Sequence, residues 1–156
     1  MPSARSIRPV LAGGLIAGMC DITYAVVFSG FRGVPAIRIL QSVASGLLGE
    51  SAFTGGWPTA ALGLALHFLI ALILAVIFYL ASRTFTGLVR HAVMSGLTYG
   101  FLVYWVMNLV VLPLSAFPRK VSFAPLVVVT GLLVHMILIG LPIALAARRA
   151  ARLSRA

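Results

Sequence analysis

The hydrophobic positions of the chain gather in four long runs, separated by shorter polar stretches. The runs cover residues 10–29, 59–82, 92–112 and 125–147. A helix that crosses a bilayer core about 30 Å thick needs about 17–25 mostly apolar residues, and each run is long enough. Inside hydrocarbon every backbone amide must be hydrogen-bonded within the structure, so the pattern predicts four transmembrane helices.

A fifth segment, residues 35–51, shows a different pattern. Its sequence is PAIRILQSVASGLLGES, in which apolar residues recur at helical spacing and polar residues fall largely elsewhere. The apolar positions are Ile37, Leu40, Val43, Ala44, Leu47 and Leu48, and the polar positions are Arg38, Gln41, Ser42, Ser45 and Glu50. This predicts one amphipathic helix that lies in the membrane interface or dips into the protein.

Composition supports a membrane protein. The chain is 62% hydrophobic and 9% charged, whereas soluble domains are about 45–50% apolar and about 25% charged. We therefore expect an all-α membrane protein, a four-transmembrane-helix bundle in which residues 1–156 form one integral membrane domain. The bilayer is its expected partner.

The 12 basic residues, against 2 acidic ones, stand at the ends of the apolar runs. One side of the membrane receives Arg5, Arg8, Arg83, Arg90, Arg148, Arg149, Arg152 and Arg155, and the other receives Arg32, Arg38, Arg119 and Lys120. The positive-inside rule then places both termini in the cytoplasm. No basic face or aromatic–basic motif accompanies the net charge of +10, so nucleic acid is not an expected partner.

Two short motifs recur along the chain. Gly63-x-x-x-His67 in the second run matches Gly131-x-x-x-His135 in the fourth, and Gly14-Leu15-x-x-Gly18 in the first matches Gly96-Leu97-x-x-Gly100 in the third. The simplest account is a duplicated helical hairpin, with the amphipathic segment added to the first copy. In a sequential bundle the second and fourth spans are diagonal, so both histidines would point inward, toward each other or toward Asp21.

The glycines of these motifs predict close helix packing. Glycines four residues apart share one helix face and let another backbone approach, which favours association in lipid. The pattern leaves open whether the partner is another span or a second copy of the chain. Because a bundle of four spans offers little internal volume, we expect a homo-oligomer.

Part of the pattern resembles a known family. The elements are His67, Ala75-Val76, Tyr79, Gly96, Gly100, Pro113-Leu114, His135 and Arg148-Arg149, and together they resemble the YagU-like small bacterial inner-membrane proteins. The resemblance covers the second to fourth runs. It implies a helical bundle in the bacterial inner membrane, and it implies no activity and no site residues.

Four polar residues interrupt the apolar runs: Asp21, His67, Asn108 and His135. Helix rise places Asp21, His67 and His135 at similar depths, about 16, 12 and 15 Å from the ends of their runs. Polar residues in the bilayer are costly and are functional candidates by default. We expect Asn108 to bond across helices, and we expect Pro142 to kink the fourth span.

Three readings of Asp21 and the histidines remain open. In the first, Asp21 and a histidine satisfy each other and fix helix packing, as in a structural or accessory protein. In the second, they form a protonatable site of an ion- or proton-coupled transporter. In the third, His67 and His135 ligate haem b, with Gly63 and Gly131 leaving room for the flat ring.

No catalytic motif accompanies these residues. With only two acids, Asp21 and Glu50, the chain excludes enzyme classes that need paired carboxylates, and no Cys/His cluster has metal-ligand spacing. We therefore expect no enzyme activity, no catalytic residue and no cofactor other than the haem alternative.

The topology yields a first testable prediction. Cysteines introduced near Arg5, near Arg90 and at the C-terminus should react with a membrane-impermeant reagent only from the cytoplasmic side, because the larger group of basic residues is retained there. Labelling of any one position from outside would contradict the model with four spans and both termini in the cytoplasm.

Overall fold

The apolar runs form helices in a computed structural model that describes residues 4–119 and 123–154. Within these residues, four helical rods are long and apolar enough to cross a membrane, in agreement with the predicted number of spans. They are α1 (Ala4–Gly30), α3 (Gly56–Thr84), the third rod α5 (Ala92–Val106), η2 (Met107–Val111) and α6 (Leu112–Leu114), and the fourth rod α7 (Pro125–Val134), η3 (His135–Gly140) and α8 (Leu141–Leu153).

The rods extend beyond the apolar runs that predict them. α1 begins at Ala4, well before the run that starts at residue 10, and α8 continues past residue 147 to Leu153 through Arg148, Arg149 and Arg152. Hydropathy marks only the part of a helix that meets hydrocarbon, whereas backbone hydrogen bonding continues through polar residues outside it.

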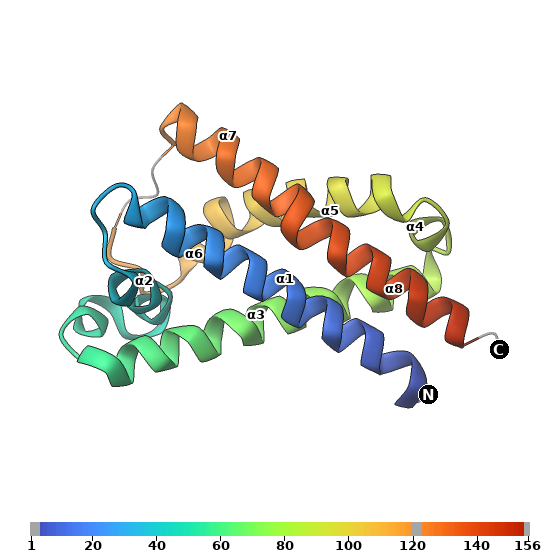
Figure 1. Cartoon of the computed structure of the whole chain (residues 1–156), viewed down its shortest axis with the longest axis horizontal. Coiled ribbons are helices and arrows are strands. Elements are labelled where there is room, and N and C mark those ends of the chain that lie inside the picture. Colours follow the sequence, from blue (N-terminus) through green and yellow to red (C-terminus); the bar gives the residue numbers. More distant parts are fainter. Residues whose placement is uncertain (1–3, 120–122, 155–156) are drawn as a thin grey trace.

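The rods run back and forth between two ends of the molecule (Figure 1). α1 begins and α8 ends at the same end, where α4 (Gly87–Arg90) also lies; we call it the termini end. The opposite end holds α2 (Ala36–Leu48) and η1 (Gly49–Phe53), and we call it the α2 end. Both termini thus share one side of the bundle, as four spans require. Which side faces the cytoplasm stays a prediction.

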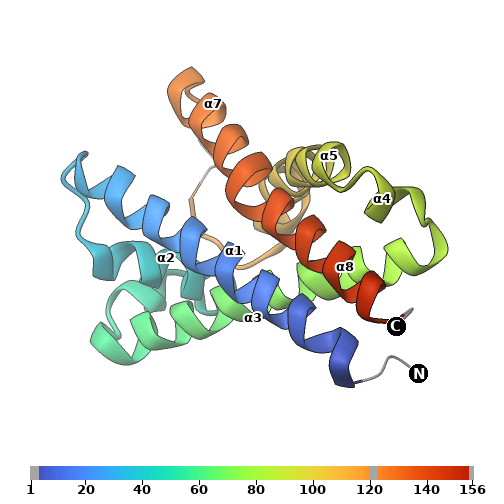
Figure 2. The same cartoon turned by 45° about the vertical axis from the view of Figure 1, so that its right-hand side comes forward.

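The four rods do not close evenly around the bundle. α1 packs against α3 and α8, and α5 packs along η3 and α8, whereas α3 and α5 make few backbone contacts. Figure 2 shows α1 and α8 lying side by side across the face of the bundle. α3 and α5 meet mainly where the Tyr99 hydroxyl donates to the Leu74 carbonyl at 2.8 Å and the Tyr99 ring packs on Phe78. The bundle therefore stays open between α3 and α5 toward the α2 end.

The main cluster of buried side chains lies at the termini end. It is built largely of small residues from the spans and includes Val10, Ala75, Phe78, Val89, Ala144 and Ala147. The outer faces of the spans are apolar as well: Ile16 is 55% exposed and Leu69 is 52% exposed. Such surfaces suit contact with lipid rather than water.

Glycines bring the third and fourth rods into backbone contact. A Cβ built at Gly96 would lie 2.8 Å from the Gly140 carbonyl oxygen, and one built at Gly100 would overlap the His135 carbonyl and lie 2.5 Å from the Met136 Cα. These distances are too short for any larger residue. The two helices consequently approach along η3 as closely as backbones permit.

The glycines of the first span face α3. A Cβ at Gly14 would lie 3.0 Å from the Ala75 Cβ, and one at Gly18 would lie 3.0 Å from the Phe68 ring. Both glycine pairs are therefore occupied by other spans of the same chain. Self-association stays a prediction, and surfaces other than these glycines would have to carry it.

The short helix α2 packs against α3 with its polar side. Gln41 is 2% exposed and donates from Nε2 to the Gly56 carbonyl at 3.1 Å, while Leu47, on the apolar side, is 63% exposed. A Cβ at Gly63 would overlap the Leu40 carbonyl, so the α2 backbone rests directly on α3. Small and polar residues fit this close contact, and contact of the apolar side with lipid stays a prediction.

Gly63 and Gly131, predicted to be equivalent by the internal repeat, have different neighbours. The α2 backbone covers Gly63, and the Tyr104 ring covers Gly131, with its Cε2 atom 2.7 Å from a built Cβ. The duplicated hairpin stays a prediction from the sequence.

A wide π-helical turn precedes a proline in each of the last two rods. η2 ends two residues before Pro113, and η3 ends two residues before Pro142. Proline lacks an N–H, and its ring clashes with the carbonyl four residues earlier. A wider turn relieves this clash. Figure 1 shows α7 and α8 as one continuous rod, with the wide turn η3 directly before the start of α8. A kink of this rod at Pro142 stays a prediction.

The contact between α5 and η3 yields a second testable prediction. Gly100→Ala should lower the free energy of unfolding by about 1–3 kcal/mol, because the added methyl group presses on the His135 carbonyl. Thermal unfolding in detergent measures the change. Gly30→Ala is the matched control, since its added methyl group meets nothing within 4 Å. Equal unfolding temperatures for the two variants would contradict this packing.

Candidate functional site

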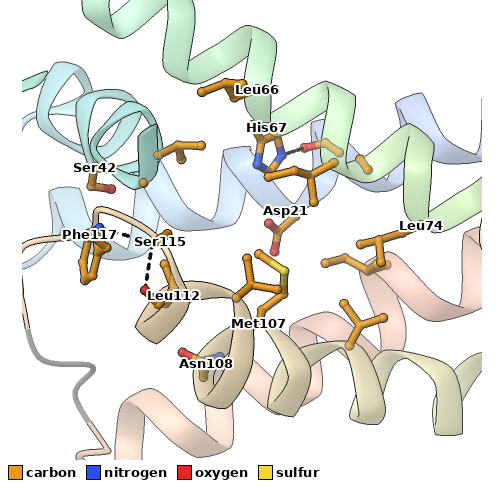
Figure 3. A pocket seen from close by; sticks show the side chains of 18 of the residues that line it. Asp21, Ser42, Leu66, His67, Leu74, Met107, Asn108, Leu112, Ser115 and Phe117 are labelled. Carbon is orange, nitrogen blue, oxygen red and sulfur yellow. Dashed lines mark hydrogen bonds between the residues drawn. The ribbon is translucent and has the colours of Figure 1, made fainter. Parts of the chain in front are cut away.

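The opening between α3 and α5 contains a cavity of about 490 Å³. Its walls come from α1, α2, α3, α5, η2, α6 and η3, and from Ser115 and Phe117 in the loop that follows α6 (Figure 3). Most lining side chains are apolar, among them Ile70, Leu74, Val111 and Ile139. The cavity also contains all four polar residues that interrupt the predicted spans: Asp21, His67, Asn108 and His135. Residues from four different helical segments thus meet in one place.

His67 joins α3 to α1. Its Nε2 atom lies 2.8 Å from the Gly18 carbonyl oxygen. A carbonyl only accepts hydrogen bonds, so Nε2 carries the proton. In the neutral ring the remaining nitrogen, Nδ1, is then a hydrogen-bond acceptor. The contact is to the α1 backbone one turn before Asp21, and not to the Asp21 carboxylate.

His135, the first residue of η3, bonds within its own rod. Its Nδ1 atom lies 2.9 Å from the Gly131 carbonyl oxygen, so Nδ1 carries the proton and Nε2 of the neutral ring is an acceptor. The Tyr104 ring meets the imidazole edge-on, with centroids 5.3 Å apart. These two contacts fix the ring on the wall of the cavity.

Asn108, on η2, is also hydrogen-bonded within its own rod. Its Nδ2 atom donates to the Tyr104 carbonyl, four residues earlier, at 2.8 Å. The amide oxygen Oδ1 is left as an acceptor. The sequence predicts a bond from Asn108 to another helix, and this prediction is wrong: the bond is to its own rod, where the wide turn after Val106 leaves the side chain close to that carbonyl.

Asp21 supplies the only acidic side chain of the cavity. Figure 3 shows its carboxyl group between His67 on α3 and Met107 on η2. Within residues 4–119 and 123–154, neither a hydrogen bond nor an ion pair to this carboxyl group is found. Asp21, His67 and His135 thus line one cavity from three different helical segments.

The hydrogen bonds to backbone give the cavity a definite chemistry. Each histidine directs one ring N–H to a carbonyl, so the other nitrogen of a neutral ring is an acceptor, and Asn108 retains its amide oxygen as an acceptor. With the Asp21 carboxyl group, four side chains thus offer acceptors between apolar walls. Such a lining complements a ligand that carries positive charge and N–H or O–H donors.

The α2 end of the cavity is covered by α2 and by a loop at residues 115–117 that the sequence does not single out. Ser115 donates from Oγ to the Leu112 carbonyl at 2.8 Å, and its Oγ accepts from the Phe117 amide at 3.2 Å. The Ala116 amide donates to the Gly46 carbonyl at 2.9 Å, which ties this loop to α2. Ser42, Ser115 and Phe117 all line the cavity, and short serine side chains in a connection give no signal of their own.

The glycines do not leave the space that the haem reading assigns to them. The backbone of α2 covers Gly63, and the Tyr104 ring covers Gly131. That part of the haem prediction is wrong. Among the described residues, no group of three or more His, Cys, Asp or Glu side chains is close enough to hold a metal ion.

Comparisons with protein-family models, with curated proteins and with solved structures find no match. The resemblance to YagU-like proteins stays a prediction from the sequence.

The hydrogen bonds of the histidines yield a third testable prediction. Ring ¹⁵N shifts should show His67 protonated on Nε2 and His135 protonated on Nδ1, because each nitrogen faces a carbonyl. His67→Gln and His135→Gln assign the signals, and His91 outside the cavity is the reference. The opposite tautomer at either ring would contradict the acceptor lining.

Proposed function

We propose that this protein is an intramembrane carrier for a small organic cation, an amine or related base with N–H donors and an apolar body. The observation that supports it is the cavity of about 490 Å³, in which Asp21, His67, Asn108 and His135 all present acceptors. Ligand pockets usually measure about 300–1,000 Å³ and combine apolar walls with a few convergent polar groups.

The charge of Asp21 decides which ligand fits. A carboxylate in a low-dielectric site is costly unless it is paired, and the described part of the chain pairs it with nothing. A cation of one positive charge would neutralise it inside the cavity. An anion would meet a like charge and three further acceptors, so the same lining discriminates against it.

The Asp21 carboxyl group also couples ligand binding to protons in this proposal. A protonated Asp21 carboxyl has no charge and becomes a hydrogen-bond donor, so it loses both features that attract the cation. Protons and ligand therefore compete for Asp21. His67 and His135 act in the same direction, since an imidazolium ion next to the ligand would repel it.

Irregular turns in two of the helices support movement of these helices around the cavity. The wide turns η2 and η3 lie directly on the cavity wall and carry Asn108 and His135. Such turns interrupt regular helical hydrogen bonding and occur frequently at functional sites. On the α2 end, α2 and the loop at residues 115–117 line the cavity and are joined through the Ala116–Gly46 hydrogen bond.

A structural role is the alternative, because the His67–Gly18 hydrogen bond also fixes α3 on α1. In that case Asp21→Asn would change stability and nothing else. The two readings differ in one measurable property, which is ligand binding that depends on the Asp21 charge.

Ligand binding yields a fourth testable prediction. Purified protein in nanodiscs should bind benzylammonium and not benzyl alcohol, which has a similar shape and no charge. Asp21→Asn should weaken benzylammonium binding about tenfold or more, since the charged contact is lost.

Glu50→Gln is the matched control, because Glu50 is the only other acid and does not line the cavity. Its binding should equal that of the wild type, and proteoliposomes should show amine uptake that Asp21→Asn abolishes. Binding or uptake that Asp21→Asn leaves unchanged would contradict the proposal. So would a red preparation whose Soret band disappears in His67→Ala and His135→Ala.

A further inference from the structure

A second hollow, of about 420 Å³, lies at the termini end between α4 and α8. It is separate from the central cavity and shares no residue with it. Its lining combines three arginines with one hydroxyl and two small apolar side chains: Arg90, Arg148, Arg152, Thr86, Val89 and Ala151.

The fold brings these arginines together from two elements. Arg148 and Arg152 are four residues apart on α8 and so share one helix face. Arg90 is the last residue of α4. This short helix packs against α8, and its Val89 side chain lies in the buried cluster. Three arginines from two elements therefore line one hollow.

Nothing in the described part of the chain neutralises this charge. Neither an ion pair nor a hydrogen bond to the three guanidinium groups is found within residues 4–119 and 123–154. The only acids of the sequence, Asp21 and Glu50, lie in the central cavity and in η1 at the α2 end. Like charges four residues apart on one helix face repel, and a bound anion reduces this repulsion.

We propose that this hollow binds a phosphate group, supplied by the head group of an anionic phospholipid. Arginine forks match phosphate oxygens with paired hydrogen bonds, and the Thr86 hydroxyl can donate one more. The hollow lies at the end of the spans, where head groups meet a membrane protein. Basic pockets of this kind between helices hold anionic head groups in the membrane interface. A soluble phosphate would meet the same three arginines.

The test is lipid binding to purified, delipidated protein. Phosphatidylglycerol should bind more tightly than phosphatidylcholine, which has no net charge. Arg148→Gln should weaken phosphatidylglycerol binding about tenfold, as expected for loss of one charged contact. Arg148→Lys should recover part of the loss, because the charge returns without the fork.

Arg149→Gln is the matched control. It removes the same charge from the adjacent position of α8, is exposed and does not line the hollow. Its phosphatidylglycerol binding should stay within about twofold of the wild type, a free-energy difference well below that of a tenfold loss. Equal weakening by Arg148→Gln and Arg149→Gln would overturn the site, as would equal binding of the two lipids. If Arg148→Gln fails to fold, Arg152→Gln replaces it.

Competition identifies the source of the phosphate. If the head group is the ligand, inorganic pyrophosphate at equal concentration should leave phosphatidylglycerol bound. Complete displacement by pyrophosphate, with the same loss in Arg148→Gln, would assign the site to a soluble phosphate and overturn the lipid assignment. The central cavity takes no part in this measurement, because benzylammonium binding and phosphatidylglycerol binding are read separately.

Discussion

The close approach of α5 to the fourth rod at Gly96, Gly100 and Gly140 is the contact on which the rest of the structure depends. Helices in lipid gain little from the hydrophobic effect, so close backbone packing decides which spans meet. α5 is held against η3, and α3 is held against α1 through Gly14 and Gly18. The second and third spans therefore stand apart, and the space between them is the central cavity.

The polar residues of the cavity are oriented by backbone carbonyls and not by one another. His67, His135 and Asn108 each direct one donor to a carbonyl, so their acceptors remain for a ligand. Asp21 adds a negative charge among them. If these groups were hydrogen-bonded to one another, they would have no acceptor left for a ligand. The proposed carrier function depends on these free acceptors. The hollow at the termini end has the opposite charge, from three arginines, and is proposed to bind an anion.

Much of the fold is predictable because the bilayer imposes it. Four apolar runs predict four spans, and the common depth of Asp21, His67 and His135 agrees with their shared cavity. The partners of each residue are not predictable from periodicity. The pattern of α2 does not show that Gln41 faces α3 while Leu47 is exposed, because the preference depends on Gly63 of another helix. The apolar pattern of the third and fourth runs likewise does not show that Asn108 and His135 lie in wide turns before Pro113 and Pro142.

The central claim is that the Asp21 carboxylate meets a cation inside an acceptor-lined cavity. Infrared difference spectra recorded on addition of benzylammonium test it most directly, because carboxyl vibrations report both protonation and hydrogen bonding. The account predicts a change in carboxyl bands that is absent in Asp21→Asn and retained in Glu50→Gln. Ligand binding without any change in the Asp21 bands would contradict it.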